Sequence, residues 1–270
     1  MVDTAANFGG SMPLYYDSIM GPAQFEPYGR DLAARLPPDL SGDVLEIACG
    51  TGRVTRHLRK NMSQDRTLVA SDISAAMLDY AKKQLGSLPG IEWREADASK
   101  LPFPDARFVA VVCAFGVMFM PDKAAALREA RRVLVKGGTL LFNVWDGLEN
   151  NPHGRCTSEL MESLLPGDPV MKGGSVPYLF NDRAVIAGLL KSAGFQPEKF
   201  QEVKIPCECP SARDFANGQI RGTPRGALLA QKGIDVDAIV DKVAEGLAKV
   251  GGAKPFRYTP QALVVEARAA

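Results

Sequence analysis

Short hydrophobic runs alternate with segments of helical periodicity through the middle of the chain. Residues 108–113 are apolar at almost every position, which is typical of a strand covered on both faces. Strands that alternate with helices form a doubly wound parallel sheet, so the pattern predicts an α/β fold. The predicted strands are 44–47, Leu68–Asp72, Ile91–Glu95, 108–113 and 139–144.

Three helices are predicted between these strands. The first follows a glycine turn and continues to about Lys60. The second is capped by Ser74 and ends at Leu85, just before a glycine. The third is opened by Pro121 and ends at Gly137 and the glycine after it.

The C-terminal part of the chain is less regular. Asn181 is expected to cap a helix that ends at Ala193. Residues 200–207 and 262–267 alternate like strands, and 236–250 form an amphipathic helix with one apolar face.

The stretch 44–55 carries the most informative chemistry. A short strand runs through a glycine turn at Gly50 and Gly52 into a helix, which places backbone N–H groups beside a crevice. Glu46 lies near those amides and would repel a pyrophosphate but not a cation. A dinucleotide fingerprint would also need a third glycine where Thr55 stands. The turn therefore favours a positively charged ligand.

An acid followed by a glycine-rich turn resembles the first motif of the class I S-adenosylmethionine-dependent methyltransferases. Ala48 stands where many members have a first glycine, and we expect no positive φ at this position. Further similar motifs follow in the family's order, and the resemblance covers residues 43–146. They are Asp72 with Ile73, the stretch 95–98, the loop 101–108 and the stretch 129–138.

The resemblance implies S-adenosyl-L-methionine as cofactor and S-adenosyl-L-homocysteine as product. Asp72 would accept both ribose hydroxyls, because a carboxylate offers two oxygens. Ile73 would pack on the adenine, and Met77 would add to that contact or lie in the core. Asp97, with Ala98 beside it, would accept the adenine amino hydrogens. The other expected cofactor-binding residues are Glu46, Ala48, Cys49, Gly50, Thr51, Gly52 and Phe115.

The family fold implies a seven-stranded Rossmann-like methyltransferase sheet with an antiparallel last strand and helical cap insertions. The expected divisions are N-terminal cap helices (1–42), the cofactor-binding core (43–146), an insertion near the active site (147–180), a helix and strand completing the core (181–210), a helical lid insertion (211–254) and the final antiparallel strand (255–270). We expect the two insertions to cover the cofactor pocket or to extend the sheet edge.

The composition limits the classes of binding partner that we expect. Hydrophobic residues make up 46% of the chain, which is enough for a substantial core. The formal net charge of +1 indicates no nucleic-acid-binding or membrane-binding surface. The five scattered cysteines are expected to be reduced thiols in a cytoplasmic protein. The N-terminus has no signal-peptide pattern, and no run is long enough to insert stably in a membrane. We expect a monomer or a homodimer, without bound metal.

Methyl transfer depends mainly on aligning the nucleophile, the methyl carbon and the sulfur, so a conspicuous catalytic residue is not required. The two candidates are His153, expected in a loop after the fifth strand, and Tyr16, in a segment that resembles the family's N-terminal cap. His153 could be a base, a substrate contact or an ordinary loop residue, and Tyr16 could serve only packing. His57 is expected at the surface.

The apolar stretch 115–120 lacks the Asn/Asp-Pro-Pro-Tyr/Phe sequence of enzymes that methylate amino nitrogens of bases or side chains. It favours a small organic acceptor with apolar surface, or it simply anchors the following helix. The leading hypothesis is a small-molecule methyltransferase of the quinone-biosynthesis type, acting on oxygen, carbon or nitrogen. The alternatives are a nicotinamide-dependent oxidoreductase and a non-catalytic protein that binds the same cofactor.

Overall fold

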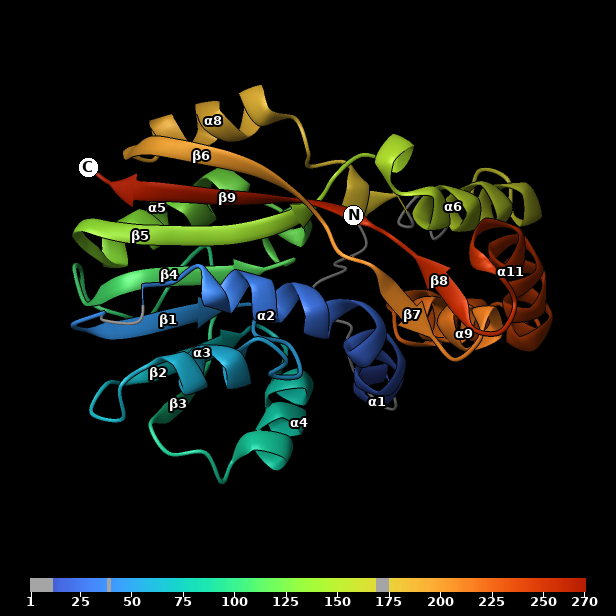
Figure 1. Cartoon of the computed structure of the whole chain (residues 1–270), viewed down its shortest axis with the longest axis horizontal. Coiled ribbons are helices and arrows are strands. Elements are labelled where there is room, and N and C mark those ends of the chain that lie inside the picture. The colour runs from blue at the N-terminus through green and yellow to red at the C-terminus, as the bar shows by residue number, and fades with distance from the viewer. Residues whose placement is uncertain (1–11, 38–39, 169–174) are drawn as a thin grey trace.

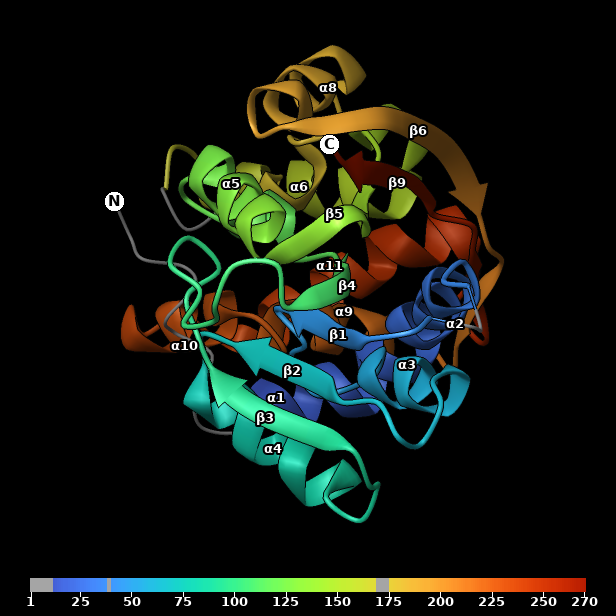
Figure 2. The ribbon, with the colours of Figure 1, turned by 90° about the vertical axis from the view of Figure 1, so that its left-hand side faces the viewer.

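A seven-stranded sheet forms the centre of the computed structural model, which describes residues 12–37, 40–168 and 175–270. The strand order is β3-β2-β1-β4-β5-β9-β6 (Figures 1 and 2). The first five strands pair in parallel, and β9 pairs antiparallel with both β5 and β6, which confirms the predicted doubly wound sheet. The strands are β1 (Asp43–Ile47), β2 (Leu68–Asp72), β3 (Ile91–Glu95), β4 (Phe108–Ala114), β5 (Leu134–Trp145), β6 (Phe195–Lys204) and β9 (Gln261–Ala269).

Helices cover the two faces of this sheet. In Figure 2, α2 (Glu26–Ala34) and α3 (Thr55–Asn61) lie on one side of the strands and α5 (Lys123–Val133) on the other. The remaining helices of this part of the molecule are α4 (Ala75–Leu85) and α8 (Arg183–Ser192). Because both faces are covered, every residue of β2 is buried, and β4 is apolar throughout and buried at most positions.

A second group of elements lies beyond the carboxyl ends of β1, β4 and β5, on the right of Figure 1. We call this group the cap. It contains a two-stranded sheet, and its helix α11 is the amphipathic helix that the sequence predicted. The cap elements are α1 (Met12–Tyr15), the π-helix η1 (Tyr16–Phe25), η3 (Leu148–Asn150), α6 (Pro152–Leu164), η4 (Val176–Tyr178), β7 (Cys207–Cys209), α9 (Ala212–Arg221), α10 (Pro224–Gln231), α11 (Val236–Gly251) and β8 (Phe256–Tyr258).

Three predicted helix boundaries were wrong. Asp122, not Pro121, caps α5, and the helix ends at Val133 instead of continuing to Gly137. The reason is that Leu134 already pairs with Phe108 of β4, so the chain turns extended before the glycines. Likewise Asp182, not Asn181, caps α8, and its carboxylate accepts two backbone N–H groups of the first turn.

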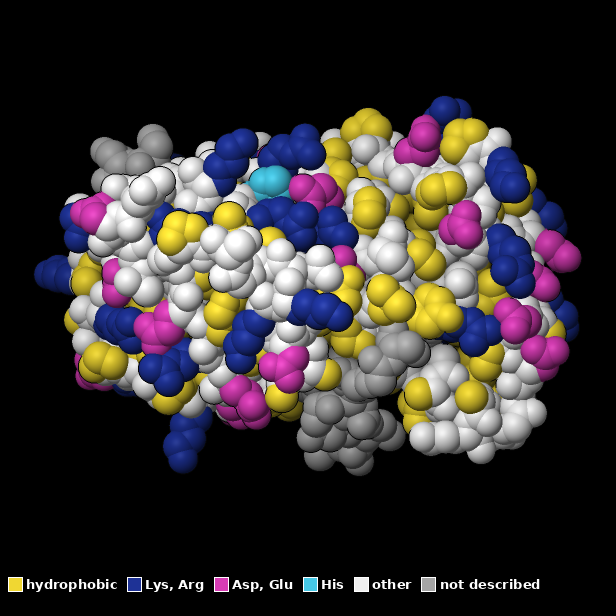
Figure 3. All heavy atoms as spheres, turned by 90° about the horizontal axis from the view of Figure 1, so that it is seen from below, with side chains coloured by type: hydrophobic (Ala, Val, Ile, Leu, Met, Phe, Trp, Pro, Cys, Tyr) yellow, Lys and Arg dark blue, Asp and Glu magenta, His cyan; other side chains and the backbone are white. Residues whose placement is uncertain are grey.

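The outer surface of the sheet half carries charges of both signs. On the face drawn in Figure 3, Lys and Arg side chains are intermingled with Asp and Glu. Within the described ranges, no helix combines the length and the apolar character needed to cross a bilayer.

The expectation for Ala48 was also wrong, because its φ is 54°. The turn after β1 requires a left-handed residue here whichever side chain is present. The alanine methyl group also restricts its neighbour, since a Cβ added to Gly116 would lie 2.5 Å from the Ala48 Cβ. Ala48 is therefore a strained position packed against a required glycine.

Replacing Ala48 by glycine should raise the free energy of unfolding by about 1 kcal/mol, because it removes the left-handed strain of an L-residue. Urea unfolding followed by circular dichroism measures the change. Ala227→Gly, at an exposed helical position of α10, should instead lower stability by about 1 kcal/mol. If Ala48→Gly lost as much stability as the control, the inference that Ala48 is strained would be wrong.

Candidate active site

The turn that joins β1 to α3 brings backbone amides to the carboxyl edge of the sheet. Gly50 and Gly52 both have positive φ, 55° and 81°. A Cβ on Gly52 would lie 2.7 Å from the Leu85 side chain, so glycine there also lets α4 approach the turn closely. Cys49 donates its backbone N–H to the carbonyl of Ser71, at 2.9 Å, which fixes the turn to β2.

Asp72 connects the turn after β1 to the turn after β2. One carboxylate oxygen accepts the Gly50 N–H at 2.8 Å, and the other accepts the Ser74 N–H at 2.9 Å. Burial raises the pKa of Asp72, while these backbone hydrogen bonds oppose the shift. Each carboxylate oxygen can accept a second hydrogen bond, so the side chain is held in place with acceptor capacity left.

Glu46 is a buried acid without a counter-charge beside it. Its side chain is on β1, the residue is 1% exposed, and its Oε2 has no hydrogen-bond partner among the described residues. Burial raises the pKa of Glu46 to about 8, and the neighbouring Asp72 carboxylate acts in the same direction. A cation placed nearby would stabilise the ionised form of this carboxyl group.

The other residues predicted around the cofactor follow the next strands. Ile73, after β2, leaves 43% of its surface exposed, whereas Met77 is buried in the core side of α4. Asp97 follows β3, is exposed, and accepts hydrogen bonds from the backbone and hydroxyl of Ser99. Ala98 beside it is partly buried. The Ala96 N–H donates to the Asp72 carbonyl at 3.0 Å, which brings the ends of β2 and β3 together.

An aromatic row connects the end of β4 to the cap. The ring of Phe115 stacks on Trp145 with centroids 3.9 Å apart, and its edge meets Phe25 at 5.8 Å. Phe25 stacks in turn on Tyr16 at 4.7 Å. Phe115 has a φ of 53°, and its N–H donates to the backbone and side-chain oxygens of Asn143. The apolar stretch after β4 thus has a packing role.

Tyr16 lies beside the acids of the site. Burial raises the pKa of the Tyr16 phenol, and the Asp72 and Asp17 carboxylates raise it further. The phenol therefore stays protonated at neutral pH and can donate a hydrogen bond.

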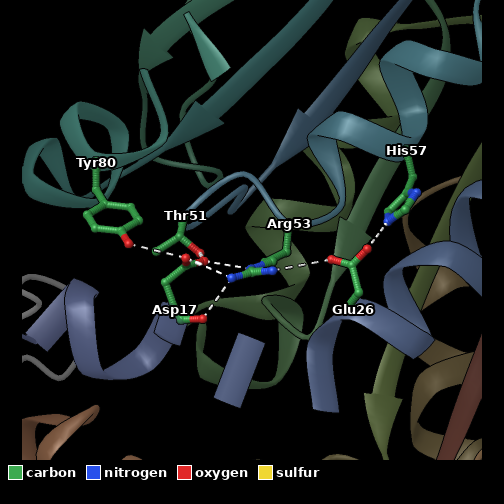
Figure 4. Close-up of polar contacts among 6 residues, drawn as sticks. All are labelled: Asp17, Glu26, Thr51, Arg53, His57 and Tyr80. Atoms are coloured by element: carbon green, nitrogen blue, oxygen red, sulfur yellow. Dashed lines mark hydrogen bonds and ion pairs between the residues drawn. The ribbon is translucent and has the colours of Figure 1, made fainter. Parts of the chain in front are cut away.

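A polar network that the sequence did not suggest holds the cap against the glycine turn (Figure 4). Asp17, on η1, accepts hydrogen bonds from the Thr51 hydroxyl at 2.8 Å, from Arg53 Nε at 2.7 Å and from Tyr80 at 3.2 Å. Arg53 also donates to the Asp17 carbonyl and lies 3.5 Å from Glu26. Thr51 and Arg53 flank Gly52, so Asp17 contacts both sides of the turn.

His57, which we expected at the surface, is partly exposed and also belongs to the same network. The ring lies between α3 and α2, is partly buried, and has its Nε2 2.6 Å from a Glu26 oxygen. Helical periodicity alone could not show this, because the partner is on α2 and lies 31 positions earlier in the chain.

His153 is in the first turn of α6 and not in a loop. The hydrogen bonds of Asn151 hold the chain in place just before this helix begins. The Asn151 amide donates to the carbonyls of Asp146, Gly147 and Gln261, and its oxygen accepts the Gln261 N–H. Gln261 in turn donates its side-chain amide to Asp146 at 2.6 Å. These contacts attach the start of α6 to the carboxyl end of β5.

The His153 ring is enclosed by aromatic residues of the cap. It is 1% exposed, with Tyr258 and Phe215 at centroid distances of 4.7 and 5.9 Å. Its Nε2 lies 3.5 Å from the Tyr178 hydroxyl, whereas Nδ1 has no hydrogen-bond partner in the described ranges. Burial lowers the pKa of His153 to about 3, so the imidazole is neutral at physiological pH.

The described residues of the site do not form a set of metal ligands. Among the residues that the structure describes, no group of three His, Cys, Asp or Glu side chains is arranged to hold a metal ion. Every one of the five cysteines is a free thiol.

Comparison with known proteins matches this site to one family. Residues 44–138 match the model of a methyltransferase domain. A ubiquinone/menaquinone biosynthesis C-methyltransferase, UbiE, of Caulobacter vibrioides is 33% identical over 186 residues, which are 63% of this chain and 73% of that protein. The corresponding protein of Hahella chejuensis is 44% identical over 101 residues, 36% of this chain and 41% of that protein.

Solved structures agree on the fold. The YcgJ protein of Bacillus subtilis has a TM-score of 0.62 at 15% identity, covering 90% of this chain and 98% of that one. A phosphoethanolamine N-methyltransferase of Haemonchus contortus, solved with S-adenosyl-L-methionine, has a TM-score of 0.60 at 16% identity, covering 95% of this chain and 56% of that one. None of these four proteins is named as a nicotinamide-dependent oxidoreductase.

Replacing Asp17 by alanine should lower the free energy of unfolding by about 2–4 kcal/mol, because it leaves the partly buried Arg53 without its main acceptor. Hydrogen exchange should show the loss first in η1 and α2. Asp31→Ala is the matched control, since Asp31 pairs with Arg35 in α2 at a more exposed position and should cost less than about 1 kcal/mol. Equal effects of the two variants would contradict the anchoring role of Asp17.

Proposed function

This chain belongs to the class I S-adenosylmethionine-dependent methyltransferases of the UbiE type, and we propose that it methylates a small organic acceptor with apolar surface. S-adenosyl-L-methionine is its cofactor. The observation that supports the proposal best is the buried Glu46 carboxyl group, whose Oε2 has no hydrogen-bond partner among the described residues, beside a glycine turn at the crevice where the strand order reverses between β1 and β4.

We propose that the cofactor is held by residues from four strand ends. Asp72 would accept the ribose hydroxyls with the acceptor capacity that its two backbone hydrogen bonds leave. The exposed Ile73 would cover one adenine face, and Asp97 with Ala98 would meet the adenine edge. The turn Ala48, Cys49, Gly50, Thr51 and Gly52 would lie along the methionyl part, with Glu46 beneath it. Met77 would support this site from the core, and Phe115 would close it toward the cap.

On the acceptor side, the residues of the cap act by positioning. The bound cofactor supplies an electrophilic methyl group, and the chain has to align a nucleophile with it in a site without water. Tyr16, kept protonated by burial, would donate a hydrogen bond. His153 would contact the acceptor through its free ring nitrogen as a neutral hydrogen-bonding group, since a pKa of about 3 makes it a weak base.

The aromatic residues around His153 indicate the type of acceptor. UbiE is named for ubiquinone and menaquinone biosynthesis, which makes an aromatic ring one acceptor class to test. The rings of Phe215, Tyr258 and Tyr178 around His153 fit an apolar or aromatic body of that kind. We place the methylated atom, which is oxygen, carbon or nitrogen, between Tyr16 and His153.

Calorimetry should show that S-adenosyl-L-homocysteine binds this protein and that NADH does not. Asp72→Ala should weaken that binding by about tenfold or more, because hydrogen bonds to a charged acceptor contribute about 1.5–3 kcal/mol each. Thermal melting of the variant checks that the turns stay folded. Tight binding of NADH, or undiminished affinity for S-adenosyl-L-homocysteine in Asp72→Ala, would contradict the cofactor assignment.

Binding of S-adenosyl-L-methionine at neutral pH should release close to one proton. Free Glu46 keeps its proton until about pH 8, whereas the unfolded chain loses it near 4.5, so ionising it lowers stability as pH rises through this window. A sulfonium cation near Glu46 favours the ionised form and expels the proton, and affinity should rise with pH up to about 8.

Titrations in two buffers of different ionisation enthalpy measure this proton release. Glu46→Gln is isosteric and cannot ionise, so its binding heat should lose the buffer-dependent part that Glu46 contributes. The same proton count in the wild type and in Glu46→Gln would show that this carboxyl group does not face the cation.

A further inference from the structure

Arg225 is an arginine of the cap without an acid to pair with. It stands in the first turn of α10, is partly buried, and has no ion pair or hydrogen bond of its side chain among the described residues. Two other partly buried arginines contrast with it. Arg53 meets Asp17 and Glu26, and Arg132 meets Glu129 and Asp105.

The described residues around Arg225 do not supply the missing negative charge. Burial lowers the pKa of the Arg225 guanidinium, and the titratable group that it faces is Tyr178. Burial raises the pKa of Tyr178, so this phenol is neutral at physiological pH. Asp237, an acid of α11, is already paired with Arg221 of α9 at 2.9 Å.

Tyr178 links Arg225 to the proposed acceptor region. Its hydroxyl lies 3.5 Å from His153 Nε2, and Gly154 gives it room, because a Cβ there would lie 2.4 Å from the phenol oxygen. The unpaired His153 Nδ1, the Tyr178 hydroxyl and the unpaired guanidinium thus belong to one set of neighbours. A ligand that carries a negative charge is the partner that this set lacks.

We propose that Arg225 binds an oxyanion group, a carboxylate or a phosphate, on the methyl acceptor. The planar guanidinium presents paired N–H donors that match either group. Tyr178 would donate a further hydrogen bond to the same group or to the acceptor body, which lies against the rings around His153. The inference rests on the proposed function, since it names the chemical class of that acceptor: an apolar or aromatic body with an acidic substituent.

Calorimetry on protein saturated with S-adenosyl-L-homocysteine tests this inference with naphthoate, naphthyl phosphate and the neutral naphthamide as probes. At least one anionic probe should bind about tenfold or more tightly than naphthamide, the effect expected of one hydrogen-bonded charge pair. Whichever anion binds more tightly identifies the group as carboxylate or phosphate. Arg225→Gln should bring the three affinities together, and Arg225→Lys, which keeps the charge, should retain part of the preference.

The matched control is Arg155→Gln on α6. Arg155 is exposed and has no ion pair among the described residues. Its replacement changes the net charge of the cap by the same amount as Arg225→Gln does, but it should leave the preference for anionic probes unchanged. Equal affinities of the anionic and neutral probes for the wild type, or an unchanged preference in Arg225→Gln, would overturn the inference. Binding of S-adenosyl-L-homocysteine to each variant tests the proposed function separately, because Arg225 has no part in the cofactor site.

Discussion

The carboxylate of Asp72 fixes the geometry on which the site depends. By accepting the N–H groups of Gly50 and Ser74, it joins the turn after β1 to the turn after β2. The backbone amides of both turns are then held at one edge of the sheet, and the left-handed residues of the first turn remain in place although an alanine occupies one of these positions. The strain at Ala48 is tolerated because the surrounding contacts leave the turn no alternative.

The position of the cap depends in part on the glycine turn after β1. Asp17 contacts Thr51 and Arg53 on either side of Gly52, and Glu26 extends the contact to His57 on α3 (Figure 4). The N-terminal elements are therefore fastened to the residues that we propose to hold the cofactor. A change at the turn is expected to reach the cap through charged hydrogen bonds, which are stronger and more directional than apolar contacts.

The sequence predicted those features that depend on short-range patterns. The positions of β1 to β4, the glycine turn and the amphipathic α11 follow from periodicity and from residue types close together in the chain. Contacts between distant segments were not predictable in this way. His57 meets Glu26 of α2, the end of α5 is set by strand pairing of Leu134 with Phe108, and His153 is placed in a helix by Asn151 and Gln261. Asp17 and Arg225 gave no signal, because an acid or an arginine without a motif resembles any surface charge.

Two ionisable groups that have no oppositely charged partner among the described residues lie in the two parts of the site. Near the glycine turn, Glu46 is an acid that lacks a cation, and in the cap Arg225 is a cation that lacks an acid. Burying a charge without a partner is costly, which is why free Glu46 keeps its proton until about pH 8, and both groups are suited to receive a partner from a ligand. A sulfonium at one end and an oxyanion at the other would satisfy both groups at once. The acceptor would then be oriented by its acidic group, with its nucleophilic atom directed at the methyl group, so that recognition and alignment depend on the same contact.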